Sequence, residues 1–251
     1  MMRFSVVIPT LNEEQYLRAC LEHLRKAGYW MEVIVVDGGS QDRTREIALE
    51  QGSTVIVSAP GRGIQQNAGA RVATGDALIF LHADTLLPAD AFDVLEKAFL
   101  DEEVQVGTFR SVFDSDSPLL RFYSYFTRFD SPLSSFGDQC IAIRKSFFVA
   151  LGGFPDWPLF EDVQLLQVAR RRTSIHKFPL AVTTSARKFV LYGTIRHQLW
   201  NALYLLLFFA GYSPYRLAVW YERRRIHHPG APLAVLPALR HNAVRPEVTI
   251  R

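Results

Sequence analysis

The sequence predicts an α/β fold with a Rossmann-like, mostly parallel central sheet, helices on both faces of that sheet, and a helical appendage at the C-terminus. Continuous apolar runs such as Val33–Val36 and Leu78–Leu81 indicate strands buried on both faces, because half-exposed strands alternate instead. Helical patterns separate these runs, and that alternation is typical of right-handed parallel units. The 251 residues, 49% of them hydrophobic, are enough to bury a large core.

The first hundred residues alternate between strands and helices. Phe4–Pro9 is expected to form a strand that ends at the proline, which cannot continue a central ladder. We expect Asn12 to cap the following helix, with Gln15 completing a capping box and Gly28 ending the helix. The remaining elements are strands over 33–37, 54–58 and 78–81 and helices over 42–51, 64–74 and 88–100.

The next part of the chain is expected to form a strand over 104–113 and an aromatic helix over 118–130. We interpret the aromatic side chains of that helix as core packing, and a surface for an apolar or sugar-bearing acceptor is the alternative. Residues 137–147 indicate a turn, a strand and the start of a helix, and a further helix begins near Glu161.

The charge of the chain is uneven. Residues 1–186 carry 18 Lys and Arg against 23 Asp and Glu, whereas residues 187–251 carry 10 against 2. Cys20 and Cys140 lie among apolar neighbours, which indicates reduced core thiols in a cytoplasmic protein. The short lead into the first strand does not resemble a signal peptide.

Two predicted strands run into a carboxylate. Asp37 follows Val33–Val36 and precedes two glycines, and Asp84 follows the strand over 78–81 together with His82. Ligands of open α/β sheets bind outside the carboxyl ends of the strands, where a divalent cation can take a carboxylate oxygen and bridge to a phosphate. The alternative is that Asp84 only begins the turn before the next helix.

Other polar residues also have two interpretations. Glu161 and Asp162 either complement the dipole of a helix N-terminus or supply a general base. The polar residues of the helix over 64–74 face either a nucleotide or solvent. Arg62 either contacts phosphate or is a solvated charge.

Five motifs give the sequence a resemblance to the family 2 glycosyltransferases of GT-A fold, in whose order they occur over roughly residues 4–185. The motifs are Val7-Ile8-Pro9-Thr10-Leu11-Asn12-Glu13-Glu14, Val35-Val36-Asp37-Gly38-Gly39-Ser40-Gln41-Asp42-Arg43-Thr44, Asn67-Ala68-Gly69 with Ala73-Thr74-Gly75-Asp76, His82-Ala83-Asp84, and Gly152-Gly153-Phe154 with Glu161-Asp162. The resemblance implies a nucleotide-sugar donor, a divalent metal, and inversion at the anomeric carbon.

The resemblance also implies a role for each matching residue. The donor contacts would be Pro9, Glu13, Asp37, Gly38, Asn67 and His82, and Arg62, which lies outside the motifs, is added to them on its charge alone. Asp84 would bind Mg²⁺ or Mn²⁺, and Asp162 would be the base, with Glu161 as the alternative. His82 stands where many relatives have aspartate, and a neutral imidazole can also ligate Mn²⁺. The His-Ala-Asp-Thr version resembles a subgroup of small bacterial family 2 proteins.

The expected activity is transfer of a sugar from a nucleoside-diphosphate sugar, with UDP favoured, to a hydroxyl acceptor that can be lipid-linked. One alternative is a catalytically inactive protein that binds nucleotide or acts as a scaffold. Another is a nucleotidyltransferase, which would need a glycine-rich basic loop where this chain has Pro9-Thr10-Leu11-Asn12. No nucleic-acid partner is expected, and a homodimer is left open.

Residues 1–188 are expected to form the catalytic domain, with a donor half over about 1–100 and an acceptor half over about 101–188, followed by a basic, aromatic helical segment and tail over 189–251. The apolar run Leu199–Ala210 is shorter than the roughly 20 residues that span a bilayer. Because basic and aromatic residues follow it, we expect this segment to rest on the cytoplasmic face of the inner membrane. Burial against the catalytic domain or in a dimer contact is the alternative.

Overall fold

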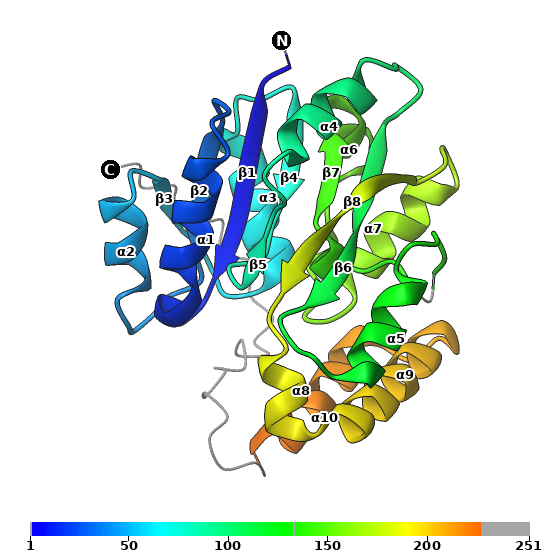
Figure 1. The fold of residues 1–251 in the computed structure, drawn as a ribbon. Helices are drawn as coiled ribbons and strands as arrows, with labels where there is room; N and C mark the ends of the chain where they lie inside the picture. The colour runs from blue at the N-terminus through cyan, green and yellow to red at the C-terminus, as the bar shows by residue number, and fades with distance from the viewer. Residues whose placement is uncertain (1, 133, 227–251) are drawn as a thin grey trace.

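The computed structural model of the protein describes residues 2–132 and 134–226, which form an eight-stranded sheet with helices on both faces (Figure 1). The strands are β1 (Phe4–Thr10), β2 (Glu32–Asp37), β3 (Thr54–Val57), β4 (Ala77–Phe80), β5 (Thr85–Leu86), β6 (Val106–Phe113), β7 (Ile141–Arg144) and β8 (His176–Thr184). Their order in the sheet is β3-β2-β1-β4-β7-β6-β8-β5.

The sheet is mostly parallel. β1 pairs in parallel with β2 and β4, β2 pairs with β3, and β6 pairs with β8. β7 is antiparallel to both of its neighbours, and the short β5 is antiparallel to β8 at the edge. Every strand except β5 and β7 therefore runs in one direction, and the predicted mostly parallel α/β sheet is confirmed.

The helices divide between the two faces of the sheet. They are α1 (Glu14–Lys26), α2 (Thr44–Glu50), α3 (Arg62–Val72), α4 (Ala91–Phe99), α5 (Pro118–Phe126), α6 (Lys145–Leu151), α7 (Glu161–Arg170), α8 (Arg187–Tyr192), α9 (Thr194–Phe209) and α10 (Pro214–Ile226), with a 3₁₀ turn η1 (Gly137–Gln139). One core lies under α1, α2 and α4, and the other lies under α3, α6 and α7. Successive residues of β1 alternate between them, with Val6 and Ile8 in the first core and Val7 in the second.

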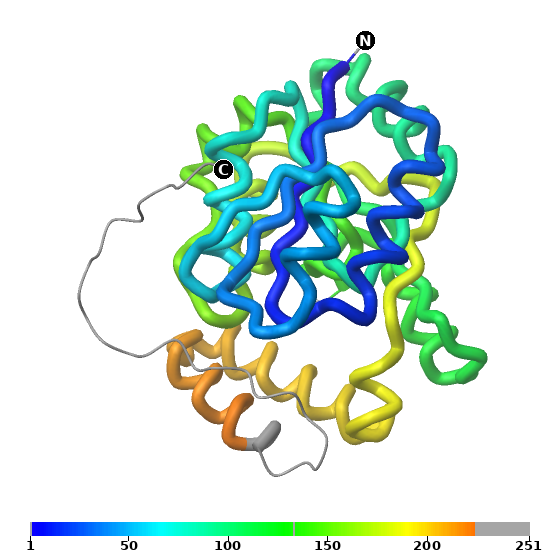
Figure 2. The backbone as a smooth tube through the Cα atoms, turned by 90° about the vertical axis from the view of Figure 1, so that its left-hand side faces the viewer, coloured from blue at the N-terminus to red at the C-terminus, as the bar shows by residue number. Residues whose placement is uncertain are grey.

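The C-terminal helices α8, α9 and α10 form a separate group below the sheet, and α5 approaches them from the side (Figures 1 and 2). Leu120 of α5 shares a small core with Ala186 and Phe189 at the start of this group. In the part of the chain that the structure describes, no helix is long and apolar enough to cross a membrane. The predicted helical appendage is confirmed.

The start of α1 corrects one prediction. Asn12 does not cap the helix, because it has a φ of +55° and its Oδ1 accepts a hydrogen bond from the Gln41 N–H at 2.9 Å. The residue before the helix is Glu13, whose N–H donates to Thr44 Oγ1 at 2.8 Å. The loop after β2 therefore supports the start of α1, which a local capping pattern does not reveal.

The interpretation of the aromatic helix as core is wrong. Within α5, which the structure describes in full, Leu120 alone is buried. The exposed fraction is 63% for Phe122 and 45% for Phe126, and it is 54% for Phe129 just beyond the helix. Only one side of the helix therefore packs against the rest of the protein, and most of its aromatic rings are exposed to solvent.

Candidate active site

The candidate site lies at the carboxyl edge of β1, β2 and β4. Asp37 ends β2 opposite Thr10 of β1, and Asp84 lies in the turn between β4 and β5. Because these three strands are parallel to one another, their carboxyl ends meet at one edge of the sheet, where open α/β sheets bind ligands.

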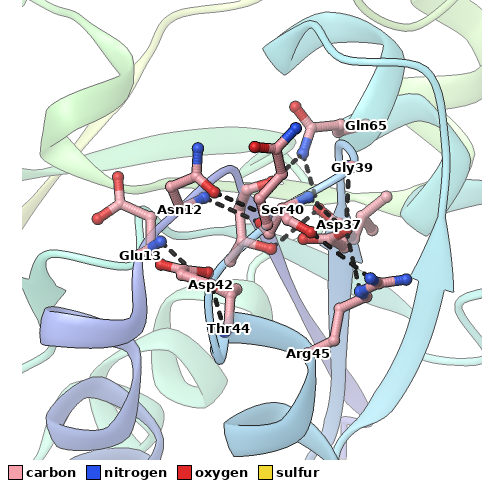
Figure 3. Close-up of polar contacts among 12 residues, drawn as sticks. Asn12, Glu13, Asp37, Gly39, Ser40, Asp42, Thr44, Arg45 and Gln65 are labelled. Carbon is pink, nitrogen blue, oxygen red and sulfur yellow. Dashed lines mark hydrogen bonds and ion pairs between the residues drawn. The ribbon is translucent and has the colours of Figure 1, made fainter. Parts of the chain in front are cut away.

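Asp37 is held by the loop that follows it (Figure 3). Its Oδ2 accepts hydrogen bonds from the N–H groups of Gly39 and Ser40, both at 3.0 Å, and Arg45 Nε lies 3.7 Å from the same oxygen. Gly39 has a φ of +95°, which favours glycine. Within the described residues, the buried Oδ1 has no hydrogen-bond partner. Because an unpaired buried oxygen is costly, Oδ1 is well placed to accept a hydrogen bond from a ligand.

Gln65 of α3 is hydrogen bonded to the backbone at the same edge of the sheet. Its Nε2 donates to the carbonyl groups of Thr10 at 2.8 Å and Val36 at 2.7 Å, and a Cβ at Gly38 would lie 3.2 Å from the Gln65 side chain. Pro9 is buried in β1 beside Val36. Gln65 is only 3% exposed, so it faces neither a nucleotide nor solvent, the two interpretations that its polarity suggested.

Asn67 holds the segment that leads to α7. Its Nδ2 donates to the Phe154 carbonyl at 2.8 Å, and its Oδ1 accepts from the Phe154 N–H at 3.0 Å. A Cβ at Gly153, which has a φ of +76°, would lie 2.7 Å from the Asn67 Oδ1. Both polar groups of the Asn67 side chain are therefore hydrogen bonded to the backbone of Phe154. These bonds join the motif that contains Asn67 to the motif that contains Phe154.

An ion-pair cluster joins Asp84 to the C-terminal helices. Nη2 of Arg187, the first residue of α8, lies 2.9 Å from Asp84 Oδ2. The same guanidinium donates to both carboxylate oxygens of Glu13, at 2.7 and 2.9 Å, and stacks on Tyr16 with Cζ 4.4 Å from the ring centre. Burial opposes the charge of Arg187, but Glu13 and Asp84 outweigh it and raise the pKa of this arginine.

Replacing Arg187 by glutamine is expected to lower the free energy of unfolding by about 1–3 kcal/mol, because the largely buried carboxylates of Glu13 and Asp84 lose their shared cation. Added Mn²⁺ without nucleotide should then stabilise the variant more than the wild type, since the divalent ion replaces the missing charge. Thermal unfolding with and without Mn²⁺ measures both effects. An equal response to Mn²⁺ in the two proteins would contradict the prediction.

The matched control for this experiment is Arg43→Gln. Arg43 also pairs with a carboxylate, that of Glu46 at 2.8 Å, but both side chains are more than half exposed. Exposed pairs contribute little, so this variant should unfold close to the wild-type temperature and should respond to Mn²⁺ as the wild type does.

His82 lies in the same charged neighbourhood. Burial and the charge of Arg62 lower the pKa of His82 to about 4, against the opposing charges of Asp84 and Asp162. The imidazole is therefore neutral at pH 7, with one ring nitrogen as donor and the other as acceptor. The turn after β4 therefore lies close enough to the start of α7 for Asp162 to influence His82.

Glu161 begins α7 and is almost fully buried. Its side chain is 3% exposed, and its Oε1 lies 3.1 Å from Nε of Arg62. Burial raises the pKa of Glu161, and Arg62 opposes that shift. Arg62 pairs with this carboxylate while 41% of the arginine side chain remains exposed, so it is neither fully solvated nor free of protein contacts.

Asp162 is the more accessible of the two adjacent carboxylates. Its Oδ2 accepts a hydrogen bond from the Gly137 N–H at 2.5 Å, and a Cβ at Gly137 would lie 2.9 Å from the same oxygen. Glycine is therefore needed for this close approach. Phe160, just before α7, has a φ of +67°, and backbone strain of this kind concentrates at functional sites.

Asp138 is a member of the site that the sequence analysis missed. It follows Gly137 in η1, and among the described residues its buried Oδ1 has no hydrogen-bond partner. Burial and the nearby charge of Asp162 raise the pKa of Asp138 to about 6, with Lys188 opposing the shift. The tripeptide 137–139 indicates only a turn in the sequence, so no local signal distinguishes this aspartate.

Within residues 2–132 and 134–226, no group of three or more His, Cys, Asp or Glu side chains is placed to hold a metal ion. Mg²⁺ is often bound by only one or two carboxylates, with water and substrate phosphates completing its shell. Asp84, 13% exposed at the edge of the sheet, offers one such carboxylate. The residues present therefore fit an ion that arrives with a diphosphate, and they do not form a complete cage.

Comparison with known proteins identifies the family of this chain. Residues 5–150 match the profile of Glycosyl transferase family 2, and the chain belongs to that family. It is 30% identical over 152 residues to Glycosyltransferase GlyG of Streptococcus pneumoniae, an alignment that covers 57% of this chain and 50% of the relative. The chain spans about half the length of the curated relatives that it matches.

Solved structures show the same fold. TarS 1-349 of S. aureus in complex with UDP-GlcNAc has a TM-score of 0.60 and 20% identity, covering 73% of this chain and 58% of that one. The mannosyltransferase PcManGT from Pyrobaculum calidifontis in complex with GDP-Man and Mn²⁺ has a TM-score of 0.59 and 20% identity, covering 92% and 66%. The fold is therefore GT-A, as the sequence motifs imply.

Proposed function

We propose that the protein is an inverting glycosyltransferase that moves a sugar from a nucleoside-diphosphate sugar, with UDP favoured, to a hydroxyl acceptor. The observation that carries the proposal is the convergence of Asp37, Asp84 and Asp162 on one edge of the sheet in a family 2 chain. Two solved neighbours contain UDP-GlcNAc or GDP-Man with Mn²⁺, which supports a nucleotide-sugar donor here.

On this proposal the nucleoside half of the donor binds between the carboxyl ends of β1 and β2. The unpaired Oδ1 of Asp37 accepts a hydrogen bond from the base or the ribose. Pro9, Gly38 and Glu13 line the pocket, and neutral His82 contacts the ribose or a phosphate. Asn67 contributes through the segment that it clamps.

The reacting end of the donor lies between Asp84 and α7. Asp84 would hold Mg²⁺ or Mn²⁺, which when bound neutralises the charge that develops on the leaving diphosphate. Asp162 takes the proton of the acceptor hydroxyl as the new glycosidic bond forms, and a single displacement of this kind inverts the anomeric carbon. Glu161 and Arg62, paired at 3.1 Å, orient the start of the helix that carries Asp162.

We place the donor site in about residues 1–100 and the acceptor site in about residues 101–188, with a lipid-linked hydroxyl as acceptor. The C-terminal segment over 189–251 then keeps the protein at the cytoplasmic face of the inner membrane, although residues 227–251 lie outside those that the structure describes.

A nucleotide screen followed by a turnover assay tests this function. UDP with Mn²⁺ should raise the melting temperature most, and a panel of UDP-sugars and GDP-sugars should identify a donor that releases nucleoside diphosphate. Stabilisation by nucleotide without turnover of any donor would favour the inactive scaffold. Release of pyrophosphate from a nucleoside triphosphate and a sugar 1-phosphate would instead identify a nucleotidyltransferase.

A further inference from the structure

The exposed side of α5 carries an apolar stripe. Leu119, Phe122 and Phe126 recur at three- and four-residue intervals along one side of the helix, and Phe129 follows three residues later, just beyond the end of the helix. Their exposed fractions are 40%, 63%, 45% and 54%. A stripe of this spacing normally faces a core, and here it faces solvent. We call these four residues the α5 stripe.

A second apolar stripe runs along α9. Ile195, Leu199, Leu203 and Leu206 are 66%, 67%, 42% and 61% exposed, and we call them the α9 stripe. The buried residues of the same helix are His197, Tyr204 and Leu205, so the stripe lies on the side that is turned away from the protein.

The two stripes belong to one end of the molecule. Figures 1 and 2 both place the C-terminal helices below the sheet, with α5 to the side of their first part. The side chains of Tyr123 on α5 and Gln198 on α9 are hydrogen bonded, and Phe113 packs edge-on against Phe189 of α8 with ring centres 5.0 Å apart. The contact of Tyr123 with Gln198 places α5 beside α9, and both stripes lie outside these inner contacts.

The apolar surface continues into a groove between α9 and α10. The groove has a volume of about 440 Å³ and is lined by Trp200, Leu203, Tyr204, Leu207, Trp220 and Arg223. Leu203 belongs to both the groove and the α9 stripe. Tryptophan and tyrosine are enriched where proteins meet the boundary between lipid and water, because their rings are apolar with one polar group.

The charge of this end of the molecule decides between possible occupants. Residues 188–223 contain four Lys and Arg against one Glu, and the α5 segment over 118–129 contains Arg121 and Arg128 and no acidic residue. A second copy of the chain seated here would bring basic surfaces together. An anionic lipid surface complements both the arginines and the apolar stripes.

We propose that the α5 stripe and the α9 stripe form one docking face for an anionic lipid bilayer. The apolar side chains enter the boundary between headgroups and acyl chains, and the arginines contact lipid phosphates. The new element is α5, since the sequence pattern places its aromatic rings in the core. The proposal rests on the membrane attachment of the C-terminal segment in the proposed function, but vesicle binding is measured without donor or turnover, so its failure is distinct from a failure of glycosyl transfer.

Co-sedimentation with vesicles tests the docking face. The full chain should bind phosphatidylcholine vesicles that contain about a third phosphatidylglycerol, and salt should weaken the binding. Phe122→Ser with Phe126→Ser, and separately Leu199→Ser with Leu206→Ser, should each lower the partition coefficient about tenfold or more, since each pair removes two large apolar side chains from the interface.

Matched controls are Leu100→Ser and Val149→Ser, which change apolar residues that are 78% and 67% exposed but lie after α4 and on α6. Both should bind vesicles as the wild type does, and thermal unfolding should show all variants folded. Wild-type binding by the α5 pair would overturn the proposal, as would equal binding to purely zwitterionic vesicles. A dimer in sedimentation velocity that the α5 pair dissociates, without vesicle binding, would identify a second copy as the occupant.

Discussion

Asp84→Asn is expected to lower turnover by about a thousandfold or more. The variant removes the protein ligand of a cation, and that cation is expected to stabilise the transition state by several kcal/mol. The same change should remove most of the extra stabilisation that Mn²⁺ gives to the UDP complex. Stabilisation by UDP without metal should persist, since Asp37 and the loop after β2 remain intact. Thermal unfolding with UDP, with Mn²⁺ and with both separates these contributions.

The chain offers a close control in Asp76→Asn. Asp76 immediately precedes β4 at its amino end, whereas Asp84 follows the carboxyl end, and each carboxylate pairs with one arginine through a contact of about 3 Å. The control variant should keep the Mn²⁺ effect and the turnover of the wild type. If Asp84→Asn also keeps them, Asp84 is not the metal ligand and the donor must bind by another arrangement.

Asp162→Asn is expected to lower turnover by about two to four orders of magnitude while donor binding stays nearly unchanged, because asparagine keeps the shape of the side chain but cannot take a proton. The Gly137 N–H, 2.5 Å from Oδ2, can donate to the asparagine carbonyl instead, while the Val163 N–H, which donates to Oδ1 at 2.7 Å, loses its acceptor. We therefore expect a folded variant with a lower melting temperature. Single-turnover rates at saturating donor, together with the UDP melting shift, measure the two effects.

Glu161→Gln is the informative comparison for that variant. Glu161 is buried against Arg62, so the substitution weakens an ion pair and should cost stability more than turnover. Loss of turnover in Glu161→Gln, with Asp162→Asn close to wild type, would assign the base to Glu161. Comparable losses in both variants would mean that the two carboxylates act together.

The sequence predicts those parts of the fold that depend on local pattern. The apolar run Leu78–Leu81 corresponds to β4, which ends one residue earlier at Phe80 and is fully buried, and Leu17, Cys20, Leu21 and Leu24 form the buried side of α1. Burial repeats with the period of the element, so these patterns reveal both the element and its inner face. The positions of Asp37 and Asp84 are also predicted, because each carboxylate follows an apolar run that forms a buried strand.

What the sequence did not predict depends on contacts between distant residues. Arg187 and Glu13 lie 174 positions apart, and no local pattern marks either as a partner of the other. The strand β8 contains Pro179, and its buried and exposed residues follow no regular order. It therefore shows neither the continuous apolar run of a buried strand nor the alternation of a half-exposed one. The α5 stripe has the spacing of a core helix, and only the tertiary structure shows that nothing in the described protein covers it.

The guanidinium of Arg187 connects the C-terminal helices to the candidate active site, because it pairs with both Glu13 and Asp84. Arg187 begins α8, so any shift of the C-terminal helices changes the charge balance around Asp84. Thermodynamic linkage requires such an effect to be reciprocal: a lipid surface that repositions these helices alters the affinity for the donor, and the donor alters the affinity for lipid by the same factor. If the acceptor is lipid-linked, as proposed above, this linkage would make the affinity for the donor depend on whether the protein is bound to the lipid surface.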